Sequence, residues 1–316
     1  MIHMMGSKKH ISVLLDRCIE MLNVKPNGIY VDATAGMGGH SSLIAASLHG
    51  GKLICIDQDN YAINILKEKF GNNKNVTVIK ANFVDTVNKL KEIGINKVDG
   101  IIADLGVSSP MFDNPERGFS YKLDAKLDMR MNQEQKLDAW FVVNKYSYER
   151  LANLFTKYGE ANEAKRVARS ICKYRDAKSI DTTLELVDII KGSVSIRNIH
   201  KKKHPARVYF QALRIEVNDE LNALSSFIES GCKLLGYQGR MAIITYHSLE
   251  DKIVKQLFNK LSNSSIPIEV PIIDESIDFK LVNKHPIVPS DEEIKNNNRA
   301  RSAKLRVIAR TNKERK

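Results

Sequence analysis

Cysteine is scarce in this chain and shows no pairing pattern. The four cysteines among 316 residues, Cys18, Cys55, Cys172 and Cys232, include no Cys-x-x-Cys pair, so neither a zinc site nor a disulfide framework is indicated and we expect no metal. Long hydrophobic runs are absent as well. No window approaches the roughly 20 apolar residues of a membrane-spanning helix, and the first residues lack the apolar stretch of a signal peptide. These absences predict a cytoplasmic protein with reduced thiols.

Acidic residues are outnumbered by basic ones. The chain has 49 Lys and Arg against 37 Asp and Glu, and its formal net charge is +12, which favours a polyanionic partner without determining the fold. Two basic clusters stand out, at 197–207 and at 299–316. They would neutralise phosphates, although a solvated surface and a frayed tail are the alternative. The residues expected to contact nucleic acid are Lys201, Lys202, Lys203, Arg207 and Arg301.

A strand followed by a glycine-rich turn lies near the start. Residues 28–34, GIYVDAT, form an apolar strand containing Asp32, and three glycines follow before a helix at 42–48. Glycine permits sharp turns and a close approach of backbone to a ligand. The nicotinamide fingerprint would need a third glycine where Ser41 stands. The turn therefore indicates a nucleotide-like ligand but fits a dinucleotide imperfectly.

Three further strands are predicted, and each ends near a residue suited to nucleotide contact. Asp57 ends the strand 52–57, Phe83 follows the strand 76–80, and Asp104 lies at the end of the strand 98–105. In open α/β sheets, ligands bind at the carboxyl ends of the strands. Each residue alone has a plainer interpretation as a helix cap, a solvated strand end or a core side chain. Together they predict an α/β, Rossmann-like fold with a nucleotide-like cofactor.

The strand at 98–105 runs into a short loop, Ser109-Pro110-Met111-Phe112. The exocyclic amine of cytosine is a poor nucleophile, because its lone pair is delocalised into the ring. A catalyst must accept hydrogen bonds from that amine and hold the ring flat. A serine hydroxyl, a carbonyl beside proline and an aromatic face could do this. The order Ser-Pro-x-Phe resembles the signature of enzymes that methylate the amino groups of bases, although such a tetrapeptide is also common in ordinary turns.

The alternation of strands and helices stops after Phe112. Helical spacing without a convincing strand is found at 137–144, 147–158, 160–174 and 182–191. This pattern predicts an all-helical insertion.

The α/β pattern then resumes. It comprises one long amphipathic helix at 209–235, a strand at 240–245, a helix at 249–261, and segments 266–273 and 303–309 that could pair as antiparallel strands. We therefore predict a core in two parts, 1–113 and 207–316, with the helical insertion at 114–206 between them.

Eight motifs, in one order, carry a family resemblance. They are His10–Leu15, Asp32–Ser41, Asp104–Pro110, Arg117–Tyr121, Leu127–Met131, Phe210–Ile215, His247–Asp251 and Arg299–Arg306. In these motifs the chain resembles the ribosomal RNA small subunit methyltransferase H family nearly end to end. The resemblance implies a class I S-adenosylmethionine-dependent methyltransferase sheet with a helical domain that helps grip RNA. It also implies methylation of N4 of a cytidine in the decoding region of 16S ribosomal RNA.

The strand ends, the glycine turn and the resemblance together define an expected site for S-adenosylmethionine. Its residues are Asp32, Gly36, Gly38, Gly39, His40, Asp57, Phe83 and Asp104. His40 alone could simply occupy the first turn of a helix. The family usually has glutamine after Pro110, where this chain has Met111, so a side-chain hydrogen bond to the cofactor is lost. Arg207 stands one place ahead of the family's usual arginine, which leaves its role open.

The expected chemistry is a direct methyl transfer without a metal or a covalent intermediate. Ser109 and the Pro110 carbonyl would accept hydrogen bonds from the N4 amine, while Phe112 or Phe119 could stack on the base. A cytidine within folded RNA must also be unstacked to react, which suits an inserted domain with basic flanks.

A proton must leave the amine, and three acceptors are open: Asp128, His247 and water. Asp128 could instead pair with Arg130, itself a candidate RNA contact, and hold the insertion closed. His247 could instead cap or pack the helix that follows it.

The expected partner is 16S ribosomal RNA or the small ribosomal subunit, bound by a monomer or a homodimer. A methyltransferase acting on a protein or small-molecule amine would not need the cluster 197–207. A non-enzymatic ribosome-assembly factor would not need the methyl donor. A nicotinamide oxidoreductase is disfavoured by Ser41 and by the Ser-Pro-x-Phe loop.

Overall fold

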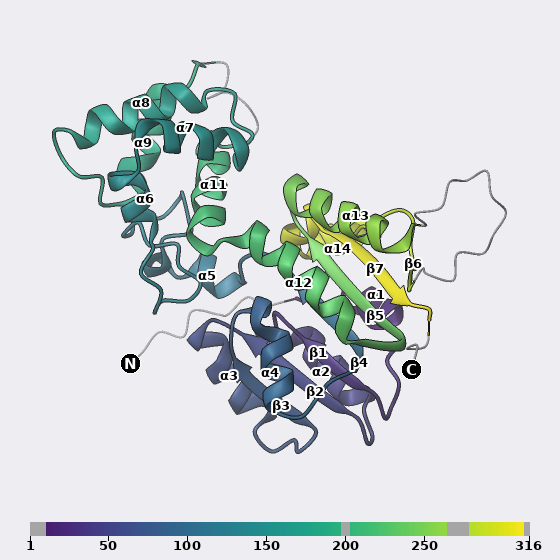
Figure 1. Cartoon of the computed structure of the whole chain (residues 1–316). Coiled ribbons are helices and arrows are strands. Elements are labelled where there is room, and N and C mark those ends of the chain that lie inside the picture. The colour runs from purple at the N-terminus through teal and green to yellow at the C-terminus, as the bar shows by residue number, and fades with distance from the viewer. Residues whose placement is uncertain (1–10, 197–202, 264–277, 313–316) are drawn as a thin grey trace, which may run out of the picture. The chain divides into compact units, whose positions relative to one another are not determined.

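The computed structural model describes residues 11–196, 203–263 and 278–312 (Figure 1). The chain divides into two compact units: the first comprises 1–106 and 221–316, and the second comprises 107–220. Among the helices in the described ranges, none is long and apolar enough to span a membrane.

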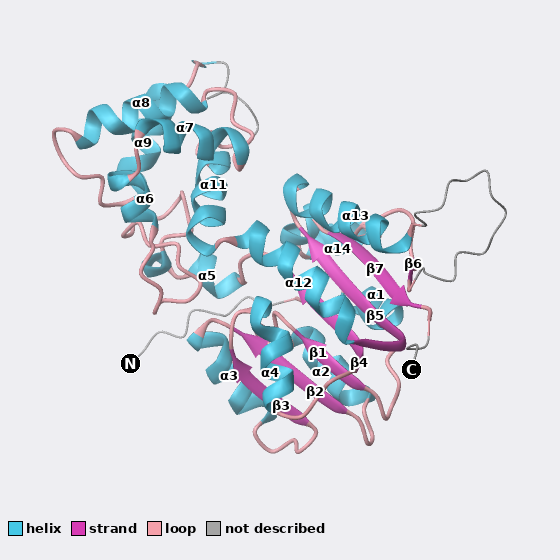
Figure 2. Cartoon of the chain, in the orientation of Figure 1, coloured by secondary structure: helices cyan, strands magenta, loops and turns pink. Residues whose placement is uncertain are grey.

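A seven-stranded sheet forms the centre of the first unit (Figure 2). Its strands are β1 (Ile29–Asp32), β2 (Lys52–Asp57), β3 (Val76–Lys80), β4 (Val98–Asp104), β5 (Leu235–Thr245), β6 (Phe279–Leu281) and β7 (Lys304–Arg310). Their spatial order is β3-β2-β1-β4-β5-β7-β6. The pairs from β3 to β5 are parallel, and β7 is antiparallel to both β5 and β6. The predicted Rossmann-like sheet is therefore confirmed, and the strand order reverses between β1 and β4.

Helices cover both faces of this sheet. They are α1 (Leu15–Leu22), α2 (Gly39–Ser47), α3 (Asn60–Phe70), α4 (Thr86–Glu92), α12 (Glu220–Leu234), α13 (Ser248–Ser262) and α14 (Asp291–Asn296). One apolar layer packs α1, α2 and α3 against the sheet, and another packs α4, α12 and α13 against the opposite face. Because both faces are covered, β2 and β4 are nearly continuous apolar runs, as expected for parallel strands.

The second unit consists of helices around a separate core. They are α5 (Ser109–Asp113), α6 (Ala139–Lys145), α7 (Tyr148–Lys157), α8 (Ala164–Arg175), α9 (Thr183–Ser193) and α11 (Arg207–Asn218). Thr182 and Glu185 form a capping box at the start of α9, in which each residue satisfies a backbone N–H near the other.

Asn218 fastens the irregular segment of the second unit to α11. Its Oδ1 accepts the Met131 N–H at 2.8 Å, and its Nδ2 donates to the Met129 carbonyl at 2.9 Å. Met129 has a φ of 59° and is fully buried, a conformation that is costly without such support. One buried amide side chain therefore fixes a strained turn.

Three predicted elements differ from the structure, and one of them is the strand at 240–245, which begins earlier, at Leu235, as β5. The single helix at 209–235 is two helices, because Asp219 adopts a φ of 48° between α11 and α12 and its N–H closes α11 on the Glu216 carbonyl. The Ser-Pro-x-Phe loop is a helical turn, α5, in which proline stands in the first turn, where its missing N–H does no harm. The predicted strand 266–273 lies outside the described residues, and β7 pairs with β5 and β6.

We expect Asn218→Ala to destabilise the protein by about 2–3 kcal/mol, since it leaves the Met131 N–H and the Met129 carbonyl buried without this partner. Urea denaturation followed by circular dichroism measures the loss. Asn153→Ala, at an exposed position of α7, is the matched control and should change stability by less than about 0.5 kcal/mol. Equal stability of the two variants would contradict the fastening role.

Candidate functional site

The glycine turn joins β1 to α2 at the carboxyl edge of the sheet. Gly36 and Gly38 have φ values of 50° and 72°, a region that L side chains rarely adopt. Gly38 is the N-cap of α2, and a Cβ there would lie 3.0 Å from the Leu66 side chain. Only glycine fits this turn without strain, which leaves its backbone N–H groups close to the strand ends.

Buried polar side chains support the glycine turn from the protein interior. Asp32 is 2% exposed and accepts the Ser41 hydroxyl at 2.6 Å. Burial raises the pKa of Asp32, while His40 and the Ser41 hydroxyl oppose that shift. His40 is 5% exposed, and its Nε2 lies 3.0 Å from the Val13 carbonyl oxygen. These two predicted cofactor residues thus direct their side chains into the protein.

The segment before α1 completes the support. A Cβ on Gly39 would lie 1.7 Å from the Ser12 hydroxyl oxygen, so the chain at Ser12 packs directly on the first turn of α2. Sequence reasoning assigned no such role to Ser12. The signal was present in the motif His10–Leu15, which the family resemblance marked without explaining.

Asp57 connects the glycine turn to the end of β2. Its Oδ2 accepts the Gly36 N–H at 2.8 Å, and its Oδ1 accepts the Asp59 N–H at 2.9 Å. Burial raises the pKa of Asp57 to about 6, although both hydrogen bonds oppose the shift. The carboxylate therefore lies beside the turn, as the sequence predicts, and shapes it as well.

Asp104 occupies the equivalent place at the end of β4. Its Oδ1 accepts the Tyr246 hydroxyl at 2.7 Å, and its N–H donates to the Thr34 hydroxyl at 2.7 Å. Burial raises the pKa of Asp104 to about 6, whereas His40 and the Tyr246 hydroxyl lower it. Because β1 and β4 are neighbours, Asp104 lies across the switch point from the glycine turn.

Tyr246 is a site residue that sequence reasoning missed. It follows β5, and its ring stands 3.4 Å from the position that a Cβ on Gly106 would take. Burial and the Asp104 charge raise the pKa of Tyr246 well above its ordinary value. The phenol thus remains protonated and donates to Asp104.

Phe83, a residue of the expected cofactor site, packs partly against another aromatic ring. Its ring meets the Phe227 ring of α12 edge to face, with centroids 5.2 Å apart. The side chain is half-buried, so part of the ring packs in the core beneath α12.

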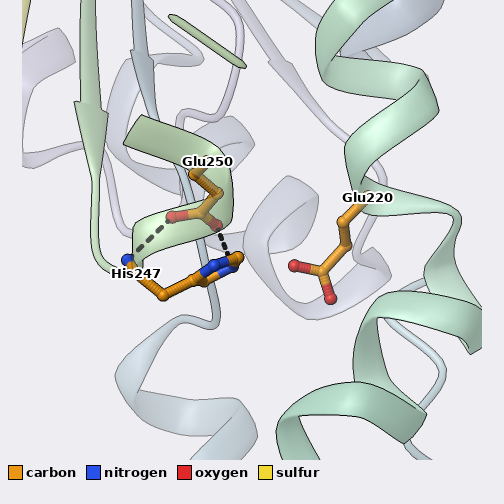
Figure 3. A group of neighbouring side chains, drawn as sticks. All are labelled: Glu220, His247 and Glu250. Atoms are coloured by element: carbon orange, nitrogen blue, oxygen red, sulfur yellow. Dashed lines mark hydrogen bonds and ion pairs between the residues drawn. The ribbon is translucent and has the colours of Figure 1, made fainter. Parts of the chain in front are cut away.

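His247 lies at the start of α13 and contacts Glu250 (Figure 3). Its Nε2 lies 3.0 Å from Glu250 Oε1, while Glu250 Oε2 accepts the N–H groups of Tyr246 and His247 at 2.7 and 3.3 Å. His247 is the N-cap residue of α13, and Glu250 is the residue whose side chain accepts the N–H groups there.

Asp128 and Arg130 form an ion pair within the second unit. Arg130 Nε and Nη2 donate to the two carboxylate oxygens of Asp128 at 2.9 and 2.6 Å. The Asp128 side chain raises the pKa of Arg130. The pairing of Asp128 with Arg130, expected from the sequence as the alternative to a role in proton transfer, is therefore observed.

Phe119, expected to stack on the base, and Met111, which stands where the family has a cofactor-contacting glutamine, both lie in the core of the second unit. Phe119 is 3% exposed and meets Phe112 edge to face, with centroids 6.3 Å apart. Met111 is 5% exposed. The Pro110 carbonyl already accepts the Asn114 N–H at 2.9 Å, leaving one lone pair. The Phe112 ring is only half-buried, so part of it is accessible.

The predicted basic contacts are at the surface wherever the structure describes them. Lys203, Arg207 and Arg301 are exposed. Arg207 is the first residue of α11. Lys201 and Lys202 lie outside the described residues.

Known proteins are similar to this chain along its length. The model of the MraW methylase family matches residues 7–311. Relatives called Ribosomal RNA small subunit methyltransferase H from Ureaplasma urealyticum and Ureaplasma parvum are each 51% identical over 307 residues, which cover 97% of this chain and 99% of theirs. The crystal structure of an rRNA methylase from Streptococcus thermophilus aligns with 94% of this chain and 93% of its own at a TM-score of 0.41 and 12% identity.

We expect Asp104→Asn to raise the melting temperature more at pH 8 than at pH 5. A carboxyl whose pKa is raised by folding favours the folded state in its neutral form, and this contribution is lost as the pH rises through about 6. The amide is neutral throughout and keeps an oxygen for the Tyr246 hydroxyl. Differential scanning fluorimetry should show a gain of a few degrees at pH 8, and an equal gain at both pH values would refute the assignment.

Proposed function

This chain belongs to the MraW methylase family, and from that premise we propose that it transfers a methyl group from S-adenosylmethionine to N4 of a cytidine in 16S ribosomal RNA. The observation that carries the proposal is the 51% identity, over nearly the full length of both chains, to relatives called Ribosomal RNA small subunit methyltransferase H. The local geometry adds a site at the switch point of the sheet, where open α/β folds bind ligands.

The residues at the switch point fit S-adenosylmethionine by the chemistry of their donors and acceptors. Three carboxyl groups, Asp32, Asp57 and Asp104, have pKa values raised by burial. Such a cluster suits a ligand that carries positive charge and ribose hydroxyls, because both stabilise carboxylates. The cofactor supplies a methyl group on a sulfonium, which is electrophilic and carries its own leaving group.

We assign the cofactor contacts to the exposed side of this edge. Asp57 would accept hydrogen bonds from the ribose hydroxyls, and the Gly39 N–H would donate to the ligand. Gly38 would shape the turn, since its own N–H donates to the Ala35 carbonyl at 2.7 Å. Phe83 would cover the adenine with the part of its ring that does not pack on Phe227. Asp32 and His40 would act indirectly, since they fix the shape of the turn.

On the substrate side, we propose that the Ser109 hydroxyl and the second lone pair of the Pro110 carbonyl accept hydrogen bonds from the N4 amine. The Ser109 side chain lies outside the described part of the structure. Phe112 would stack on the base, because the Phe119 ring is committed to the core. Both carboxylate oxygens of Asp128 accept hydrogen bonds from Arg130, and the His247 ring nitrogens are buried, with Nε2 3.0 Å from Glu250 Oε1. We therefore assign the departing proton to water. The chain's own task is positioning rather than general base catalysis.

Binding of S-adenosylmethionine should weaken as the pH falls through about 6, since protonation removes the charge of Asp57 and Asp104. In Tyr246→Phe the Asp104 carboxylate loses a donor, so its pKa rises further and the acid limb of binding moves to higher pH. Isothermal titration calorimetry between pH 5 and 8 measures both effects. Tyr237→Phe, on the exposed part of β5, is the control and should follow the wild-type curve.

A Tyr246→Phe curve that coincides with the wild-type curve would show that the hydroxyl does not tune Asp104. If calorimetry detects no binding of S-adenosylmethionine by the wild-type chain at any pH, a non-enzymatic assembly factor becomes the better assignment.

The function is tested by mass spectrometry of 16S RNA nucleosides from cells that lack this protein. We expect N4-methylcytidine to be missing and to return with the wild-type gene, but not with Asp104→Ala. Asp188→Ala, at an exposed position of α9, is the matched control and should restore the modification. The proposal fails if N4-methylcytidine persists in cells without the protein.

A further inference from the structure

Helix α8 of the second unit has an unbalanced charge. Its 12 residues, AKRVARSICKYR, include five basic side chains and no acidic one. Arg175 is used internally, because its guanidinium donates to the Val143 carbonyl at 2.6 Å and to the Tyr146 carbonyl near the end of α6. The other four are exposed: Lys165, Arg166, Arg169 and Lys173.

These four cations share one face of the helix. At about 100° per residue they fall within an arc of about 100°, on the side opposite the buried Val167, Ala168 and Ile171. Lys165 and Lys173 are about 12 Å apart along the axis. Arg166 lies 3.9 Å from Glu163, whereas Lys165, Arg169 and Lys173 form no ion pair within the described part of the chain. A row of like charges is unfavourable by itself and is complementary to a row of phosphates.

A groove adjoins this face. It has a volume of about 520 Å³ and is lined by Ser170, Lys173, Tyr174, Ala177, Lys178 and Ile189. Tyr174 is 40% exposed, so its ring is open to solvent. Lys173 belongs to both the cationic face and the groove. Proteins that hold single strands combine this pair of features, a cationic track for the backbone and an aromatic ring on which a base stacks.

We propose that the α8 face binds a single-stranded segment of the substrate RNA. Lys165, Arg169 and Lys173 contact consecutive backbone phosphates, and one unstacked base enters the groove against Tyr174. The inference rests on the proposed function, since it names where the RNA substrate is gripped. The face lies outside both basic clusters, 197–207 and 299–316, that the sequence singled out.

The first test compares Lys165→Gln/Arg169→Gln/Lys173→Gln with the control Lys252→Gln/Lys255→Gln/Lys260→Gln, which removes three exposed charges from α13. Fluorescence anisotropy with a fluorescein-labelled 12-nucleotide single-stranded RNA gives affinity against salt concentration. We expect the slope of log affinity against log salt to fall by about 2 for the α8 variant, at about 0.7 per phosphate contact. Equal slopes for the two triple variants would overturn the phosphate contacts.

The second test isolates the base. Tyr174→Ala should weaken binding of the same RNA about five- to a hundredfold without changing the salt slope, whereas Tyr174→Phe retains the affinity. Because Tyr174 is partly exposed, melting temperatures within about 2 °C of wild type are expected and check folding. Unchanged affinity of Tyr174→Ala would show that no base stacks on Tyr174 in the groove.

Methylation of isolated small ribosomal subunits separates this inference from the proposed function. With radiolabelled S-adenosylmethionine, the α8 triple variant should show a KM for subunits raised at least tenfold, with kcat retained. If the wild-type protein does not methylate subunits or their RNA, the proposed function fails. If it does, and the α8 variant matches the α13 control, only this inference fails.

Discussion

The hydrogen bond from the Gly36 N–H to the Asp57 carboxylate is the constraint on which the site depends. It ties the turn after β1 to the end of β2, and it requires a backbone that only glycine adopts easily at this φ. Once the turn is fixed, α2 begins at Gly39, and Ser41 reaches back to Asp32. The Thr34 hydroxyl then accepts the Asp104 N–H from β4. A short network of polar contacts thus holds three strand ends at one edge of the sheet.

This arrangement is unfavourable to the free protein. Burial raises the pKa of Asp32, Asp57 and Asp104, so ionising them at neutral pH opposes folding. The hydrogen bonds that surround them offset this only in part, because the pKa values stay raised. A cationic ligand would relieve the imbalance and stabilise the folded state. Sites of this kind lose stability in exchange for affinity. Neutral substitutions at the strand ends should therefore stabilise the free chain and reduce its enzymatic activity.

The sequence predicted β1 to β4 to within two residues at either end, whereas β5 begins at Leu235, before the predicted 240. The close agreement for β1 to β4 has a physical reason. Strands such as 52–57 and 76–80 are short apolar runs bounded by turn residues, and their carboxyl ends meet at one edge in any doubly wound fold. Tyr246 escaped prediction because its meeting with Asp104 depends on the register of β5 against β4, across 142 residues of chain. The break at Asp219 escaped as well, since a single residue with positive φ leaves the hydrophobic periodicity on both sides intact.

The predicted substrate residues show where residue type alone is insufficient. Asp128, Arg130 and Phe119 have suitable chemistry, yet two of them neutralise each other and the third is buried. The basic residues divide in the same way. Arg117 donates to the Arg130 and Met131 carbonyls and is 7% exposed, and Arg214 holds Glu220 with two hydrogen bonds, because a planar guanidinium can satisfy several fixed acceptors at once. Part of the net charge of +12 is therefore unavailable to any polyanion. A nucleic acid can contact only the basic side chains that are exposed, and on α8 the exposed basic side chains lie in a single row.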